Sequence, residues 1–253
     1  MADAIAAFKD AFSSYKQNAV DYCIYSILMG AANGVLMLAI LAAFVILGVL
    51  SAGSALSIAG AGGGFSLAAV GVLAVLVVVA VGFVIFLWLE AGLTGAYMET
   101  LNMLATGRKQ SFGGFFKLVP KRATAILGIW IIMGLCIGVP LLGAVLLAPA
   151  LGQMGFIALL LFSAFIALVI SILFFFALPA AVLDGRGAMA AIGSSLSASG
   201  RNIVAIILYV IVSAIISIPG LVLMLIGIGS LYLLLFYIPL VQLAMLLLYK
   251  KAR

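Results

Sequence analysis

Residues 65–90 read FSLAAVGVLAVLVVVAVGFVIFLWLE, and this stretch contains no charged residue before Glu90. A helix of ~20 apolar residues matches the ~30 Å hydrocarbon core of a bilayer. A single segment in lipid can satisfy its own backbone hydrogen bonds only as a helix. The stretch therefore predicts a membrane-spanning helix.

The same apolar character extends along the chain, which is 68% hydrophobic and 7% charged. A soluble domain carries about 25% charged residues. We interpret residues 1–253 as a single all-α, polytopic membrane domain whose helical bundle has six spans, at 22–50, 65–89, 123–148, 156–183, 202–226 and 231–249. The uncharged, Gly-, Ser- and Ala-rich residues 51–64 predict a turn, as do residues 149–155.

The basic residues predict the orientation of these spans. With six spans, all twelve Lys and Arg residues fall on the side that holds both termini and the second and fourth connections: Lys9, Lys16, Arg108, Lys109, Lys117, Lys121, Arg122, Arg186, Arg201, Lys250, Lys251 and Arg253. An odd number of spans would spoil this segregation. Because basic residues are retained in the cytoplasm, we expect a plasma-membrane protein with cytoplasmic N- and C-termini. Charges that act as topology signals also argue against a nucleic-acid partner.

The first twenty residues look amphipathic. Ile5, Phe8, Phe12 and Tyr15 recur at helical spacing, which predicts that residues 1–20 form a short cytoplasmic helix in the membrane interface. The charged residues before the first apolar run are not typical of a cleavable signal, so we expect the first span to be retained. Lys and Arg near a membrane surface attract anionic lipid. The bilayer and its anionic head groups are therefore the expected partners, beside an unidentified protein partner.

Internal similarity suggests three consecutive hairpin repeats, each entered from the cytoplasm after a basic or polar segment. Aligning Arg122 with Arg201, or Asn18 with Asn202, brings similar residues into register: Trp130 with Tyr209, Gly134 with Ser213, Gly138 with Ser217, Pro140 with Pro219, Ser13 with Ser197 and Tyr25 with Tyr209. Such repeats would be parallel, whereas many transporters are built from inverted repeats.

Three carboxylates near the spans are the candidate functional residues. Glu90 ends the second apolar run, near the cytoplasmic boundary, and Glu99 lies on a helical extension beyond it. Ionisable residues inside membranes are costly and usually functional. Glu90 is therefore either a proton or cation ligand in a cytoplasmic cavity or a boundary carboxylate paired with a loop Arg or Lys. Asp21 begins the first span, where the helix dipole favours an acid.

The other polar residues, the prolines and the cysteines have structural interpretations. Asp184, in an Asp-Gly-Arg-Gly turn, is expected to be exposed or turn-forming, and Pro219-Gly220 predicts a helix break. Cys23 and Cys136 lie inside apolar runs, and the chain has no histidine. It also lacks Walker, HExxH and GxSxG motifs. We expect no catalytic residue, cofactor or metal, and therefore no enzyme; close glycine pairs leave a homo-oligomer open.

The last third of the chain resembles a known family. Residues 174–187, FFFALPAAVLDGRG, are followed by Ser194-Ser195, Arg201-Asn202, a span with Pro219, a Gly-rich turn and a span with Pro239. This pattern is similar to the six-helix membrane domain fused to some glycerophosphodiester phosphodiesterases and to related bacterial and archaeal membrane proteins. The resemblance is clearest over 175–250. It implies a noncatalytic membrane domain, because catalysis in the fusions belongs to a separate soluble domain, and no functional residue carries over.

Three functional hypotheses follow. The leading one is a noncatalytic membrane scaffold, or a partner- or lipid-interaction module, which predicts no solvent-filled cavity. The alternative is a small transporter or permease with Glu90 near its path, which predicts a cavity open to one side at a time. A membrane-embedded lipid enzyme is third, and it predicts a polar cluster near the interface.

Overall fold

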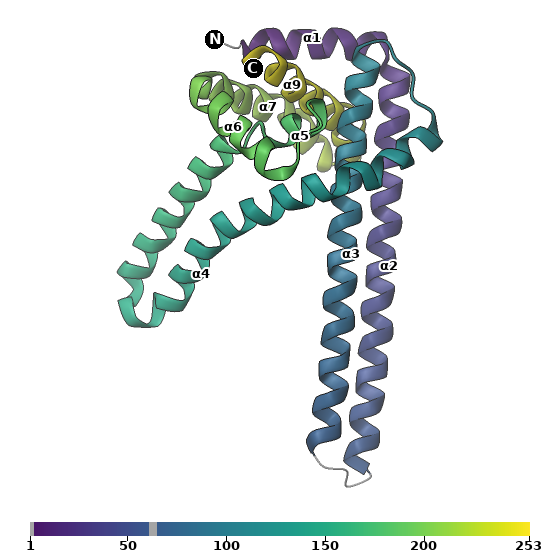
Figure 1. The fold of residues 1–253 in the computed structure, drawn as a ribbon, viewed down its shortest axis with the longest axis vertical. Helices are drawn as coiled ribbons and strands as arrows, with labels where there is room; N and C mark the ends of the chain where they lie inside the picture. Colours follow the sequence, from purple (N-terminus) through teal and green to yellow (C-terminus); the bar gives the residue numbers. More distant parts are fainter. Residues whose placement is uncertain (1–2, 61–64) are drawn as a thin grey trace.

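The computed structural model describes residues 3–60 and 65–253, and over these residues the chain is almost entirely helical and contains no strand. Figure 1 shows the arrangement of the helices. In chain order they are α1 (Ala4–Gln17), α2 (Ala19–Gly60), α3 (Phe65–Ala105), α4 (Phe112–Leu173), α5 (Ala177–Leu183), α6 (Ala188–Arg201), α7 (Ile203–Met224), α8 (Gly229–Tyr232), the π-helical segment η1 (Leu233–Tyr237) and α9 (Ile238–Ala252).

Within residues 3–60 and 65–253, six helical stretches are long and apolar enough to cross a membrane. They are Ala19–Ala43, Leu76–Ala105, Phe112–Leu147, Ala150–Leu183, Ile203–Met224 and Gly229–Ala252. The predicted all-α, polytopic membrane fold with six spans is therefore confirmed.

The helices form a compact base from which hairpins diverge (Figure 1). We use "base" for α1, α5, α6 and the parts of α3, α4 and α9 that pack with them; both chain ends lie there. Outside the base, large apolar side chains are exposed, as at Leu38 (66%), Val84 (58%) and Phe162 (60%). Exposed apolar surface on this scale fits contact with lipid.

The first hairpin is longer than predicted, because residues 51–60 continue α2 as a helix instead of forming a turn. At ~1.5 Å per residue, the 42 residues of α2 extend about 60 Å. Glycine weakens a helix by about 1 kcal/mol relative to alanine. That cost is outweighed where little water competes for the backbone groups. The predicted turn at 61–64 lies outside the described residues.

The second hairpin turns where expected and breaks where it was not expected. Gly152 has φ +64°, ψ −178° and separates the two arms of α4, within the predicted turn at 149–155. The predicted span 156–183 is interrupted after Leu173, and α5 begins at Ala177. Pro179 fits the break: it has no N–H for the carbonyl four residues earlier, and it lies in the first turn of the new helix, where that N–H is not needed.

The third hairpin contains two prolines with different effects. The predicted break at Pro219-Gly220 is wrong, because α7 continues to Met224; membrane helices tolerate proline where neighbours satisfy the freed groups. Pro239 follows η1 and has no N–H to donate to the carbonyl of Leu235. The hydroxyl of Tyr15 donates to that carbonyl instead, at 2.8 Å.

Two of the three sequence repeats share a joint of the same geometry. Asn18 separates α1 from α2 with φ −126°, ψ 29°, and Asn202 separates α6 from α7 with φ −127°, ψ 27°. Each side-chain amide donates to the carbonyl four residues earlier, at 3.3 Å for Asn18 and 2.9 Å for Asn202. The aligned Tyr25 and Tyr209 are both 5% exposed. In the middle repeat Ala123 occupies the joint, and α4 runs through it without a break.

We call α1, residues 112–122 and α6 the lead helices of units 1, 2 and 3. Hairpin 1 is α2 with α3, hairpin 2 is residues 123–183, and hairpin 3 is α7 to α9. Each lead helix packs on the hairpin of the preceding unit. Lead helix 2 packs so closely on hairpin 1 that a side chain at Gly92 would lie 2.6 Å from the carbonyl of Val119. On lead helix 3, Ser195 donates to the carbonyl of Leu173 (2.7 Å) and accepts from the amide of Phe176 (3.1 Å).

Lead helix 1 closes the ring by packing on hairpin 3. The rings of Phe8 and Tyr209 stack at 5.1 Å. In the centre, the second arms of the three hairpins contact one another in pairs, through α3, α5 and α9. The base is therefore a closed arrangement of three similar units, from which the hairpins diverge.

We predict that Asn202→Ala destabilises the protein more than Asn18→Ala. Asn202 is 4% exposed and its amide also reaches the carbonyl of Ala252 at 3.5 Å, so its loss leaves buried carbonyls short of a donor, at a cost of about 2 kcal/mol. Asn18 is half-buried, and its loss should cost about 1 kcal/mol. The free energy of unfolding in mixed micelles measures both, with the exposed Ser197→Ala as control. Equal losses at both joints would contradict the prediction.

Candidate functional site

Glu90 lies between the helices of hairpin 1. One of its carboxylate oxygens accepts a hydrogen bond from the side-chain amide of Asn33 on α2, at 3.2 Å. The amide oxygen of Asn33 is buried and has no partner among the described residues. A second pair lies nearer the base: Ser26, seven residues before Asn33, and Tyr97, seven residues after Glu90. Their hydroxyls share a hydrogen bond of 2.6 Å. Two polar pairs therefore connect α2 and α3 across an otherwise apolar seam.

In the described part of the chain, Glu99, and not Glu90, forms an ion pair with an arginine. Arg122 on lead helix 2 lies 2.6 Å from the carboxylate of Glu99, and the two side chains are only 12% and 13% exposed. Arg122 also donates to the carbonyl of Ala181 on α5, at 3.2 Å. This single ion pair connects hairpin 1, lead helix 2 and hairpin 2. Asp21 is half-buried in the first turn of α2, the position where the helix dipole favours an acid.

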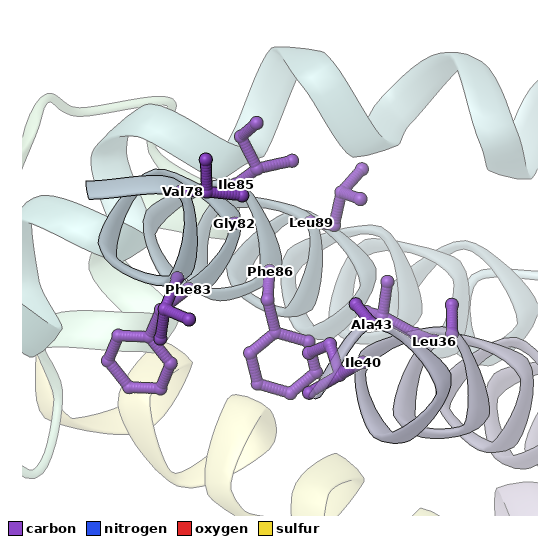
Figure 2. Close-up of a pocket in the computed structure, with 11 residues that line it drawn as sticks. Leu36, Ile40, Ala43, Val78, Gly82, Phe83, Ile85, Phe86 and Leu89 are labelled. Carbon is purple, nitrogen blue, oxygen red and sulfur yellow. The ribbon is translucent and has the colours of Figure 1, made fainter. Parts of the chain in front are cut away.

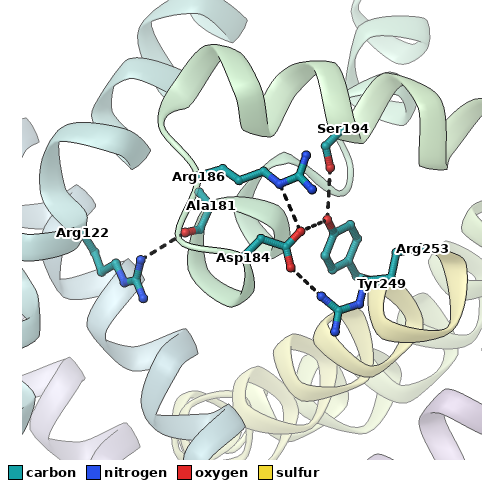
Figure 3. Close-up of polar contacts among 7 residues, drawn as sticks. All are labelled: Arg122, Ala181, Asp184, Arg186, Ser194, Tyr249 and Arg253. Atoms are coloured by element: carbon teal, nitrogen blue, oxygen red, sulfur yellow. Dashed lines mark hydrogen bonds and ion pairs between the residues drawn. The ribbon is translucent and has the colours of Figure 1, made fainter.

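Asp184 is the centre of a second polar cluster (Figure 3). It accepts from the hydroxyl of Tyr249 at 2.8 Å and lies 2.5 Å from Arg253 and 3.3 Å from Arg186. Its side chain is 13% exposed, and the residue forms the turn that ends α5, which is the second of the two expected alternatives. Ser194 on α6 bonds Tyr249 at 3.1 Å. The cluster connects the end of hairpin 2 to the C-terminus.

Tyrosine hydroxyls connect elements of the base by donating hydrogen bonds to backbone carbonyls of other elements. Tyr209 donates to the carbonyl of Val241 at 2.8 Å, and Tyr25 donates to the carbonyl of Gln110. Burial raises the pKa of the Tyr15 hydroxyl, so this group stays protonated and remains a donor to hairpin 3. Sequence reasoning missed these contacts. The available signal was tyrosine within apolar runs, where a buried hydroxyl needs a partner.

Two grooves run along hairpin 1. The α2–α3 groove has a volume of about 260 Å³ and is lined by apolar side chains and backbone (Figure 2), among them Leu36, Ile40, Val78, Phe83, Phe86 and Leu89. The α2–α4 groove, of about 670 Å³, lies under lead helix 2 and is lined by Leu28, Ala31, Val35, Trp88, Phe116 and Pro120 with six further apolar residues. Neither lining includes a charged residue.

Fold and site together define an α-helical integral membrane protein. Across residues 3–60 and 65–253, no three His, Cys, Asp or Glu side chains gather closely enough to hold a metal ion. Comparison with protein-family models, with curated proteins and with solved structures found no match.

We predict that Glu99→Gln lowers the free energy of unfolding by about 3 kcal/mol, because it leaves Arg122 as an uncompensated, nearly buried charge. Arg122→Met should have a similar effect. The double variant should lose clearly less than the sum of the single losses, since no unpaired charge remains. A double-mutant cycle in mixed micelles measures this coupling.

The matched control is Asp10→Asn, which breaks the ion pair with Lys251. That pair has a similar length, 2.8 Å, but is exposed, so its loss should cost well under 1 kcal/mol. Additive effects of Glu99→Gln and Arg122→Met would show that the two side chains act independently.

Proposed function

We propose that this chain is a noncatalytic membrane scaffold, whose base holds the hairpins so that their apolar surfaces interact with lipid or with partner helices. The observation that carries the proposal is the separation of polar from apolar groups between the base and the first hairpin. The polar groups of the base bond one another, whereas the grooves along the first hairpin are apolar.

The base supports a structural role because its nearly buried carboxylates are paired with arginines. Glu99 is paired with Arg122, and Asp184 accepts from three groups at once. A general acid or base must be free to exchange a proton with a substrate in a plausible pose. Carboxylates bound in this way are suited to fixing helices in place.

The grooves support contact with lipid because an aqueous path needs polar groups along it. The α2–α3 groove has only apolar side chains in its lining, and it adjoins the position of Glu90, where a transport path would have to pass. The resemblance of residues 175–250 to noncatalytic membrane domains points to the same function. The distribution of basic residues supports a cytoplasmic position for the base, and the membrane that we propose is the plasma membrane.

We predict that Phe86→Cys is protected from a membrane-impermeant maleimide. The test uses a chain in which Cys23→Ser and Cys136→Ser remove the native thiols. Labelling at position 86 should be slower than at exposed Ser111→Cys by on the order of 100-fold, because the reactive thiolate forms only in contact with water. Both positions should label equally after denaturation. Rapid labelling at position 86 in the folded protein would show that water enters the groove, and it would contradict the scaffold proposal.

A transporter remains the second candidate because of one observation. Glu90 pairs with Asn33, and the buried amide oxygen of Asn33 has no partner in the described part of the chain. An unsatisfied oxygen beside a carboxylate is a place where a proton or cation could bind. The pair lies between the two helices that flank the α2–α3 groove.

A proton-flux assay separates the two candidates. We expect liposomes with wild-type protein and with Glu90→Gln to dissipate an imposed pH gradient at the same rate, as reported by an entrapped pH-sensitive dye. A scaffold offers no route for protons through the α2–α3 seam. Faster dissipation by the wild type than by Glu90→Gln and by protein-free liposomes would favour the transporter.

A further inference from the structure

A third groove lies beneath lead helix 1, between α1 and hairpin 3. Its volume is about 470 Å³, within the usual size of a ligand pocket, and its lining includes Ile5, Phe8, Lys9, Phe12, Tyr232 and Phe236. We call it the α1 groove. Lys9 is its sole charged lining residue. Phe12 and Ile5 are 50% and 60% exposed, so the groove has an apolar mouth beside the basic end of the molecule.

The α1 groove and the α2–α4 groove occupy equivalent places in units that repeat. Each lies between a lead helix and the hairpin of the preceding unit. The alignment of Asn18 with Asn202 pairs Ala32 with Ile216 and Val35 with Pro219. All four of these residues line a groove, the first member of each pair in the α2–α4 groove and the second in the α1 groove.

The lead helix at each groove carries lysine residues. In the α1 groove, Lys9 follows the lining residue Phe8; in the α2–α4 groove, Lys117 follows Phe116 and Lys121 follows Pro120. Lys117 and Lys121 are exposed. Neither groove has a carboxylate in its lining, and the adjacent Asp10 is paired with Lys251. The α1 groove therefore has a lysine in its apolar lining, and the α2–α4 groove has two exposed lysines next in the chain to its lining residues. Within residues 3–60 and 65–253, none of these three lysines is in an ion pair.

We propose that each of these two grooves binds one acyl chain of an anionic glycerophospholipid. The phosphate of that lipid is held by a lysine of the lead helix, Lys9 at the α1 groove and Lys117 at the α2–α4 groove. This inference rests on the proposed function and names the ligand class and the sites of its lipid contacts. An acyl chain matches the apolar lining, and the phosphate matches the lysine. A partner helix would match the floor alone and leave the lysines without a counter-charge.

Trp88 makes the α2–α4 groove directly observable, because it belongs to the lining. The chain has two tryptophans, so Trp130→Phe leaves Trp88 as the single reporter. The full chain is reconstituted in phosphatidylcholine vesicles that contain an equal fraction of either chain-brominated phosphatidylglycerol or chain-brominated phosphatidylcholine. Quenching of Trp88 fluorescence gives the binding constant of phosphatidylglycerol relative to phosphatidylcholine.

The expected result is a preference for phosphatidylglycerol that falls about fivefold in Lys117→Gln, from the usual contribution of one lysine near an anionic surface. Lys16→Gln removes the same charge from lead helix 1 and should leave the preference at Trp88 unchanged. Ala31→Phe should reduce quenching by both lipids, because Ala31 is exposed in the groove that the new ring fills.

The α1 groove is tested in the same way. Phe12→Trp supplies the reporter in a chain with Trp88→Phe and Trp130→Phe, and Lys9→Gln should lower the preference for phosphatidylglycerol about fivefold. Here Lys117→Gln becomes the charge-matched control.

Equal quenching by the two lipids in the parent chains would overturn the inference, and so would equal effects of Lys117→Gln and Lys16→Gln at Trp88. Either result is compatible with the scaffold proposal, because the groove would still bind lipid without a preference for anionic head groups. The scaffold fails on a different observation, namely rapid labelling of Phe86→Cys from water.

Discussion

The structure depends on the fact that lipid gives apolar helices little reason to associate. In water, burial of apolar surface drives packing, but lipid chains are as apolar as the helices themselves, so association rests on close packing and polar contacts. The distribution of contacts in this chain follows from that constraint. Ion pairs and tyrosine hydroxyl contacts gather in the base, and the helices pack tightly there. Farther out, hairpins 1 and 2 diverge (Figure 1).

The closed base explains how hairpins 1 and 2 can diverge while the three hairpins still form one unit. Each lead helix packs on the hairpin before it, and α1 completes the ring by packing on the last hairpin of the chain. Tyr15 illustrates how sequence chemistry supports this closure. Pro239 has no N–H for the carbonyl of Leu235 four residues earlier, and the Tyr15 hydroxyl donates to that carbonyl. The N-terminal helix therefore bonds a backbone group of the C-terminal hairpin.

The features that follow from local chemistry could be predicted from the sequence, and those set by distant contacts could not. Six spans, the turn near Gly152 and the helical nature of residues 4–17 follow from hydropathy, turn residues and periodicity. The continuation of α2 through residues 51–60 was missed because turn rules describe chains in water. The partners of Glu99 and Asp184 were missed because Arg122 and Arg253 reach them through the packing of separate helices, which no local pattern encodes. The repeat was visible in the alignment of Asn18 with Asn202, but its meaning emerged only from the matching joint geometry.

The position of Glu90 is best understood through the register of hairpin 1. Its pairing with Asn33 and the pairing of Tyr97 with Ser26 are separated by seven residues on each helix, which is two helical turns. Two long apolar helices of nearly uniform surface could slide past each other at little cost. Polar pairs that recur at this spacing hold one antiparallel register, because any slip would leave a carboxylate and an amide unpaired in an apolar seam. A buried polar group that fixes register is well attested in helical assemblies. On this reasoning Glu90 and Glu99 act on the same helix in related ways: Glu99 fixes α3 to its neighbours in the base, and Glu90 fixes α3 to α2 where the base ends.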